Sequence, residues 1–94
     1  MRQFRWAAAA LRDLRRIELR ADATDPLLAG RIFDEIERKI GRLLDFPFSG
    51  PAFAGSRLRK LSVPRFDYLV IYQVMAETIV ILRVRHAHED WLRL

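Results

Sequence analysis

Residues 66–85 read FDYLVIYQVMAETIVILRVR, and this segment decides the fold. Its first part, residues 66–74, is rich in β-branched and aromatic residues, as is typical of a well-covered strand. Residues 75–78 can turn the chain, and residues 79–85 then return as a second strand. Because both strands are apolar at nearly every position, we expect both faces of this hairpin to be covered over much of their length.

Two amphipathic helices are predicted upstream of the hairpin, joined by a short break. Residues 7–21 begin with strong helix formers, and their apolar stripe consists of Leu11, Leu14, Ile17 or Glu18, and Ala21. Residues 28–46 carry a second stripe with the same spacing. In the break, Asp25 is expected to cap the second helix, with Pro26 at its first position. Two such helices pack as an antiparallel hairpin whose shared apolar side needs a sheet to cover.

Two further strands complete the predicted sheet. Residues 2–6 suffice for one short strand, and residues 57–63 alternate basic and apolar side chains up to Pro64. The predicted fold is a single two-layer α+β domain of residues 1–94. It has an N-terminal strand, a helical hairpin, a three-stranded antiparallel sheet and a short C-terminal tail. The second face of the sheet then needs a cover: a second copy of the chain, a partner peptide, or tail residues Trp91, Leu92 and Leu94.

The composition narrows the classes of function. The 94 residues contain no cysteine, which excludes a disulfide framework, a thiolate zinc site and a cysteine nucleophile. No apolar run is long enough to span a bilayer and no signal-peptide core is present, so a cytoplasmic protein without membrane contact is expected. The net charge is +5, and fifteen of the seventeen basic residues are arginines, which suits nucleic acid or an acidic protein partner.

Short segments in a fixed order run along nearly the whole chain. They are Ala10-Leu11-Arg12-Asp13-Leu14, Pro47 with Gly50, Arg59-Lys60-Leu61, residues 68–74, and residues 79–86 with Asp90-Trp91 behind them. In this order, and with these predicted elements, the chain resembles the RelE/ParE superfamily of bacterial toxins from toxin–antitoxin pairs. The long helical hairpin and the ending His86-Ala87-His88-Glu89-Asp90-Trp91 are closer to the ParE branch.

The resemblance implies a toxin of a type II toxin–antitoxin system. ParE-like members poison DNA gyrase, and a flexible segment of a cognate antitoxin, here ParD-like, wraps the toxin in a hetero-oligomer and neutralises it. No cofactor and no metal are implied, and the chain itself makes or breaks no bond. The expected target-binding residues are the basic end of the sheet and the tail: Arg57, Arg59, Lys60, Arg65, Arg83, Arg85, His88 and Trp91.

The alternative is an mRNA interferase, because RelE-like members of the superfamily cleave messenger RNA, usually on the ribosome. Metal-free cleavage needs a base, an acid and a cation for the charged phosphorane. His86 or His88 would act as acid or base, and the phosphate clamp would come from Arg59, Arg83 or Arg85. RelE-type enzymes carry an arginine just after the tyrosine that opens the third strand of their sheet. This chain has Leu69 there, which counts against the alternative.

The C-terminal side chains also have structural interpretations. A histidine at the end of a strand commonly caps it or bonds a nearby backbone group, and this interpretation is favoured for His86. Trp91 is interpreted as a packing anchor of the tail. His86, His88, Glu89 and Asp90 include metal-ligand types, but such close neighbours rarely converge, so no metal site is expected. A third hypothesis, a plain nucleic-acid-binding domain, lacks a recognition helix or a stacking motif.

Overall fold

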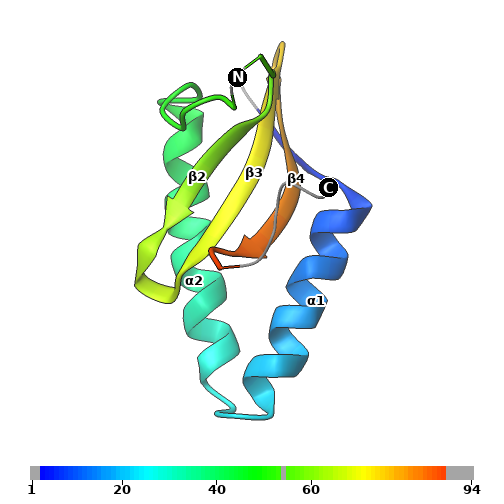
Figure 1. The fold of residues 1–94 in the computed structure, drawn as a ribbon, viewed down its shortest axis with the longest axis vertical. Helices are drawn as coiled ribbons and strands as arrows, with labels where there is room; N and C mark the ends of the chain where they lie inside the picture. Colours follow the sequence, from blue (N-terminus) through cyan, green and yellow to red (C-terminus); the bar gives the residue numbers. More distant parts are fainter. Residues whose placement is uncertain (1–2, 54, 89–94) are drawn as a thin grey trace.

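The computed structural model describes residues 3–53 and 55–88, which form a sheet with two helices on one face (Figure 1). The elements in chain order are β1 (Gln3–Trp6), α1 (Ala8–Asp22), α2 (Leu28–Gly41), the 3₁₀ turn η1 (Arg42–Leu44), β2 (Arg59–Val63), the 3₁₀ turn η2 (Pro64–Phe66), β3 (Tyr68–Met75) and β4 (Thr78–His86). This arrangement confirms the predicted two-layer α+β fold.

The sheet has four strands in the order β1-β4-β3-β2. As predicted, β2, β3 and β4 are antiparallel to their sequence neighbours. The N-terminal strand β1 lies parallel to β4, with Phe4 opposite Ile79 and Trp6 opposite Ile81. The sheet is therefore mixed, and the first and last strands of the chain lie side by side.

Both β2 and β3 begin two residues later than the sequence predicts. Residues 57–58 precede β2, and residues 66–67 belong to the connection between β2 and β3. The ring of Pro64 fixes a helical φ and starts η2. Asp67 follows this turn with a φ of 59°, in the left-handed region. Because a strand cannot pass through this conformation, β3 starts at Tyr68.

The buried stripe of α1 is displaced from the predicted one. The buried residues of α1 are Ala10, Asp13, Ile17 and Ala21. The prediction is confirmed for Ile17 and Ala21, but it is wrong for Leu11, which is 53% exposed. The observed stripe includes a carboxylate, Asp13, which is therefore buried inside the protein.

The helix α2 is shorter at both ends than predicted. It begins at Leu28 instead of Pro26, and Asp25 Oδ1 accepts the N–H of Leu27 at 3.0 Å. Asp25 thus closes the turn between the helices and does not cap α2. The α-helix ends at Gly41, and η1 continues the chain to Leu44. Its predicted apolar stripe is confirmed for Ala29, Ile32, Ile36, Ile40 and Leu43, but it is wrong for Leu44, which is 43% exposed.

A bulge interrupts β4 at Leu82. Tyr72 pairs with Ile81, whereas the preceding Ile71 pairs with Arg83, so two residues of β4 oppose one step of β3.

The bulge decides which way the end of β4 faces. Ile79 and Ile81 lie in the core between sheet and helices, and strict alternation would direct Arg83 and Arg85 into the same core. The extra residue reverses the alternation, and Val84 enters the core instead.

The face of the sheet away from the helices, here called the second face, is covered at its centre. Ile71 and Val80 point to this face and are buried. The tail residues considered as its cover, Trp91, Leu92 and Leu94, lie outside the described residues. The exposed large apolar side chains of the described chain lie mainly elsewhere: Leu11, Leu19, Leu27, Leu44, Phe46, Phe48 and Met75. None of the described helices combines the length and the apolar character needed to cross a membrane.

Candidate functional site

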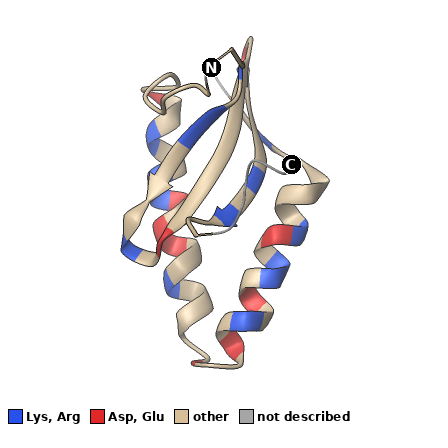
Figure 2. Ribbon diagram, viewed as in Figure 1, with Lys and Arg blue, Asp and Glu red and all other residues tan. Residues whose placement is uncertain are grey.

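The basic residues predicted for target binding are spread over the sheet and its connections (Figure 2). Arg59 and Lys60 lie on β2, Arg83 and Arg85 on β4, Arg57 and Arg65 in the segments that flank β2, and His88 beyond β4. Trp91 lies outside the described residues. Strand alternation directs Lys60 and Arg85 to the second face. Arg59 and Arg83, by contrast, hold other parts of the chain.

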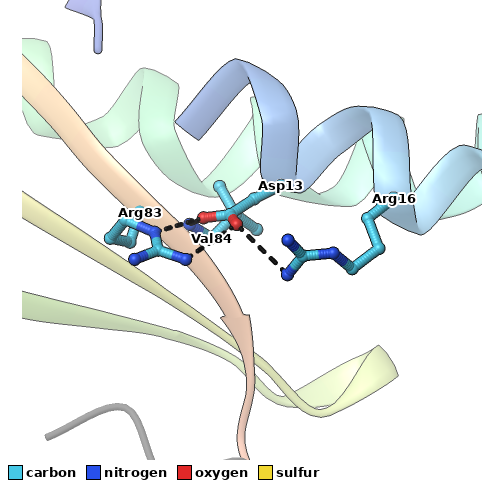
Figure 3. A network of polar contacts seen from close by, with 4 residues as sticks. All are labelled: Asp13, Arg16, Arg83 and Val84. Carbon is cyan, nitrogen blue, oxygen red and sulfur yellow. Dashed lines mark hydrogen bonds and ion pairs between the residues drawn. The ribbon is translucent and has the colours of Figure 1, made fainter. Parts of the chain in front are cut away.

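A buried carboxylate joins α1 to β4 (Figure 3). Asp13 accepts two hydrogen bonds from Arg83, from Nε to Oδ2 at 2.8 Å and from Nη2 to Oδ1 at 3.0 Å. Its Oδ2 also accepts the backbone N–H of Val84 at 2.9 Å, and Arg16 Nη1 lies 3.7 Å from Oδ1. The bidentate guanidinium and the backbone N–H satisfy a carboxylate that is 2% exposed. We call this network the Asp13 clamp.

The Asp13 clamp is not predictable from a local sequence pattern, because Asp13 and Arg83 lie 70 residues apart. The one sequence feature that indicates burial of Asp13 is its helical spacing. Asp13 lies three residues after Ala10 and four before Ile17, on the stripe that α1 buries. The geometry of the sheet explains the need for it. β1 pairs with β4 up to Ile81, so the N–H of Val84 beyond it requires another acceptor, which Asp13 supplies.

The connection between η1 and β2 contains a ridge, residues 46–51, that two side chains hold in place. Tyr72 Oη accepts the N–H of Gly50 at 3.0 Å and donates to the carbonyl oxygen of Pro47 at 2.9 Å. Arg59 Nη1 donates to the carbonyl oxygens of Phe48 at 3.1 Å and Gly50 at 2.8 Å. The guanidinium of Arg59 also lies 4.9 Å from the centroid of the Phe48 ring. Arg59 is therefore directed at the ridge.

The pKa of Tyr72 predicts how the ridge responds to alkaline pH. Burial raises this pKa above its ordinary value, and the Gly50 N–H and nearby Arg59 offset part of the effect. The folded state thus holds the phenolic proton more tightly than the unfolded state. The contribution of Tyr72 to stability should be complete below about pH 10, the ordinary tyrosine pKa, and should be lost as the pH rises through the higher folded-state pKa.

Substitution of Tyr72 by phenylalanine tests this expectation. Tyr72→Phe leaves the Gly50 N–H and the Pro47 carbonyl without their partner, so it should lower the free energy of unfolding by about 1–3 kcal/mol at pH 8. The difference in the free energy of unfolding between the two proteins should shrink at pH 11, because ionisation of Tyr72 then destabilises the wild type as well. Urea unfolding at both values measures it, and Tyr68, present in both proteins, cancels from the comparison. A difference that stays constant with pH would contradict the raised pKa.

Two hollows that adjoin the ridge are lined in part by basic residues. A groove of about 600 Å³ is lined by Lys39, Arg42, Phe46, Ser49, Gly50, Pro51, Lys60, Leu61 and Ser62. A second hollow, of about 380 Å³, is lined by Phe48, Ser56, Arg57, Arg59 and Val74. The side chains of Phe46 and Phe48 are both more than half exposed. Because exposed aromatic and arginine side chains typify the strongest contacts of protein interfaces, the ridge and its flanks form the candidate functional site.

The two histidines lie together at the end of β4. The N–H of His88 donates to Nδ1 of His86 at 3.3 Å, and their ring centroids are 5.1 Å apart. The His86 ring also packs edge-on against Tyr68, with 5.4 Å between centroids. His86 thus bonds a nearby backbone group, as its structural interpretation expects.

The side chains considered for RNA cleavage are only partly gathered: Arg85, His86 and His88 lie together at the end of β4, whereas Arg59 and Arg83 are held by other parts of the chain. Arg59 pairs with Tyr72 and His86 with Tyr68, four residues along β3, which places their strand positions about 13 Å apart. Arg59 is bound to the ridge and Arg83 to the Asp13 clamp. Within residues 3–53 and 55–88, no three carboxylate or imidazole groups could hold a metal ion. Glu89 and Asp90, considered as metal-ligand types, lie outside the described residues.

Comparison with known protein families gives one match along most of the chain. The model described as "ParE toxin of type II toxin-antitoxin system, parDE" matches residues 4–91. No curated protein matches the chain.

Several solved structures share the fold. One of the "Chromosomal ParDE TA system from P. aeruginosa" has a TM-score of 0.81 at 21% identity, covering 94% of this chain and 98% of that one. One of the E. coli DinJ-YafQ toxin-antitoxin complex has a TM-score of 0.67 at 14% identity, covering 96% and 97%. The solution structure of a conserved hypothetical protein from Helicobacter pylori has a TM-score of 0.62 at 19% identity, covering 95% and 98%.

Proposed function

Because the chain belongs to the ParE toxin family of type II toxin–antitoxin systems, we propose that it arrests growth by inhibiting DNA gyrase and that a cognate, ParD-like antitoxin neutralises it. The observation that carries this proposal is the family match over residues 4–91. The similarity to a ParDE structure along 94% of the chain supports the same branch of the superfamily. In this proposal the toxin acts in the cytoplasm by binding, and it forms a hetero-oligomer with its antitoxin.

Two of the three arginines considered as a phosphate clamp are engaged in structural contacts, which favours a binding function over RNA cleavage. An interferase needs an acid, a base and a cation around one phosphate. Here Arg83 is bound by a buried carboxylate, and Arg59 is bound by the ridge at a distance from the histidines. We therefore propose that target contacts come from the other members of the predicted set: Arg57, Lys60, Arg65, Arg85 and His88, together with Trp91.

Supercoiling by purified gyrase provides the test. The purified chain should inhibit the conversion of relaxed plasmid to the negatively supercoiled form, and transcripts in a translating extract should stay intact. Arg85→Glu should raise the inhibitory concentration by about tenfold, because it reverses one charge at an interface. Arg31→Glu, the same change at an exposed position on α2, is the matched control and should behave as the wild type.

Two results would contradict this proposal. Unaffected supercoiling together with rapid cleavage of messenger RNA would establish the interferase instead. Equal weakening by Arg85→Glu and Arg31→Glu would show that total charge, and not the end of β4, determines inhibition.

A further inference from the structure

The groove beside the ridge brings together three basic side chains from three elements. Lys39 comes from the last turn of α2, Arg42 from η1 and Lys60 from β2. Within the described part of the chain, neither Lys39 nor Arg42 forms an ion pair with a carboxylate. The negative end of the α2 dipole favours the first two cations. It does not account for Lys60, which reaches the same groove from the sheet.

Apolar surface accompanies these charges. Phe46 is 67% exposed and lines the groove together with Leu61 of β2. A large apolar side chain on the surface is ordinary by itself, but this one lines a hollow together with three cationic side chains. The groove therefore suits a ligand with both negative charge and an apolar side chain.

The wall of the groove is already fixed. Gly50 is bonded through its N–H to Tyr72 and through its carbonyl oxygen to Arg59, and the carbonyl oxygen of Pro51 accepts the N–H of Lys60 at 3.1 Å. Because this wall is already ordered, less conformational entropy is lost when a ligand binds.

The other wall of the groove is the edge strand β2. The N–H of Lys60 points away from β3 to Pro51, so Ser62, two residues on, also directs its backbone groups to the outer edge. Ser62 lines the groove. A backbone donor and acceptor at a strand edge are complementary to an extended peptide, which favours a peptide over a nucleic acid at this site.

We infer that this groove binds an acidic, extended segment of the antitoxin. Carboxylates of that segment pair with Lys39, Arg42 and Lys60, and one of its apolar side chains packs on Phe46. The inference rests on the proposed neutralisation by an antitoxin. It assigns the groove as the toxin surface that the antitoxin contacts, and a negative charge to the antitoxin segment that binds there. Arg85 and His88 are not among the residues that line the groove, but Lys60 belongs both to the groove and to the proposed target contacts.

Calorimetric titration of the purified antitoxin into the purified toxin tests the inference. Lys39→Glu/Arg42→Glu should raise the dissociation constant by about tenfold or more at low salt, and the effect should shrink as salt is added. Phe46→Ala should raise it by about tenfold, as expected for an apolar anchor. The matched control is Arg12→Glu/Arg31→Glu, which makes the same change in charge at exposed helix positions and should leave the constant within about twofold of the wild type.

Unchanged antitoxin binding by the groove variant, or an equal loss in the control, would overturn the assignment while leaving neutralisation intact. Failure of the wild type to bind the antitoxin would overturn the proposed neutralisation and this inference with it. If the groove variant lost affinity for duplex DNA while keeping its antitoxin, the groove would be a nucleic-acid site and the inference would be wrong. Thermal unfolding of all variants establishes that they fold.

Discussion

Replacing Asp13 by alanine should lower the free energy of unfolding by about 3–5 kcal/mol, because it removes one partner of a buried ion pair. The guanidinium of Arg83 would then lie next to the core with its side chain 21% exposed, and the N–H of Val84 would lose its acceptor. Many domains of this size have a total stability of about 5–15 kcal/mol, so the variant should be marginally folded. Urea unfolding at neutral pH, followed by circular dichroism, measures the loss.

The same network supplies its own controls. Arg16 lies 3.7 Å from Asp13 but its side chain is 57% exposed, so Arg16→Ala should cost less than about 1 kcal/mol. A double variant, Asp13→Leu/Arg83→Met, removes both charges and should recover much of the stability lost in Asp13→Ala, since the unpaired charge is the main penalty. If Asp13→Ala cost no more than Arg16→Ala, the Asp13 clamp would be unimportant for stability.

Replacing Gly50 by alanine should destabilise the protein by about 3 kcal/mol, near the upper end for overpacking. A β-carbon at this position would lie 2.5 Å from the carbonyl oxygen of Lys60 and 2.7 Å from Tyr72 Oη. The first neighbour is the backbone of β2, which cannot move aside as a flexible side chain would. The ridge must therefore shift, and the hydrogen bonds that Gly50 makes with Tyr72 and Arg59 should weaken together.

Two other glycines provide matched controls for this change. Gly30 and Gly41 lie in α2, and a β-carbon at either position meets nothing within 4 Å. Gly30→Ala and Gly41→Ala should therefore stabilise the helix by about 0.5–1 kcal/mol each. Thermal unfolding of the three variants should give one large decrease and two small increases in Tm. A Gly50→Ala protein as stable as the wild type would show that the ridge is not held against β2 as described.

Local patterns were sufficient for the elements of this fold and insufficient for the contacts between them. The stripe of α2 and the apolar strands 68–75 and 78–86 each repeat with the period of their own element, so a single segment carries the signal. The burial of Asp13 has no such signal, because the compensating guanidinium lies on β4. The charged residues of α1 therefore include one, Asp13, that belongs to the core and not to the solvated face of the helix.

In the candidate site, too, local patterns predicted the elements but not the contacts between them. The alternating pattern of residues 57–63 predicted a basic strand, but not that the loop before β2 would return over Arg59. Likewise, spacing alone placed Arg83 and Arg85 on one face of a strand, but it did not show that the bulge at Leu82 would reverse that face or that Asp13 would hold Arg83. A bulge changes the direction of every later side chain without leaving a distinctive residue in the sequence.

The parallel pairing of β1 with β4 ties completion of the fold to completion of translation. During synthesis β1 and α1 leave the ribosome first, but the strand that β1 pairs with and the guanidinium that Asp13 binds are both made about 70 residues later. Neither contact can form in a nascent chain that stops before β4. A prematurely terminated product therefore lacks the partner of its first strand and exposes an unpaired carboxylate, which makes it a poor substitute for the finished protein and a ready substrate for proteolysis.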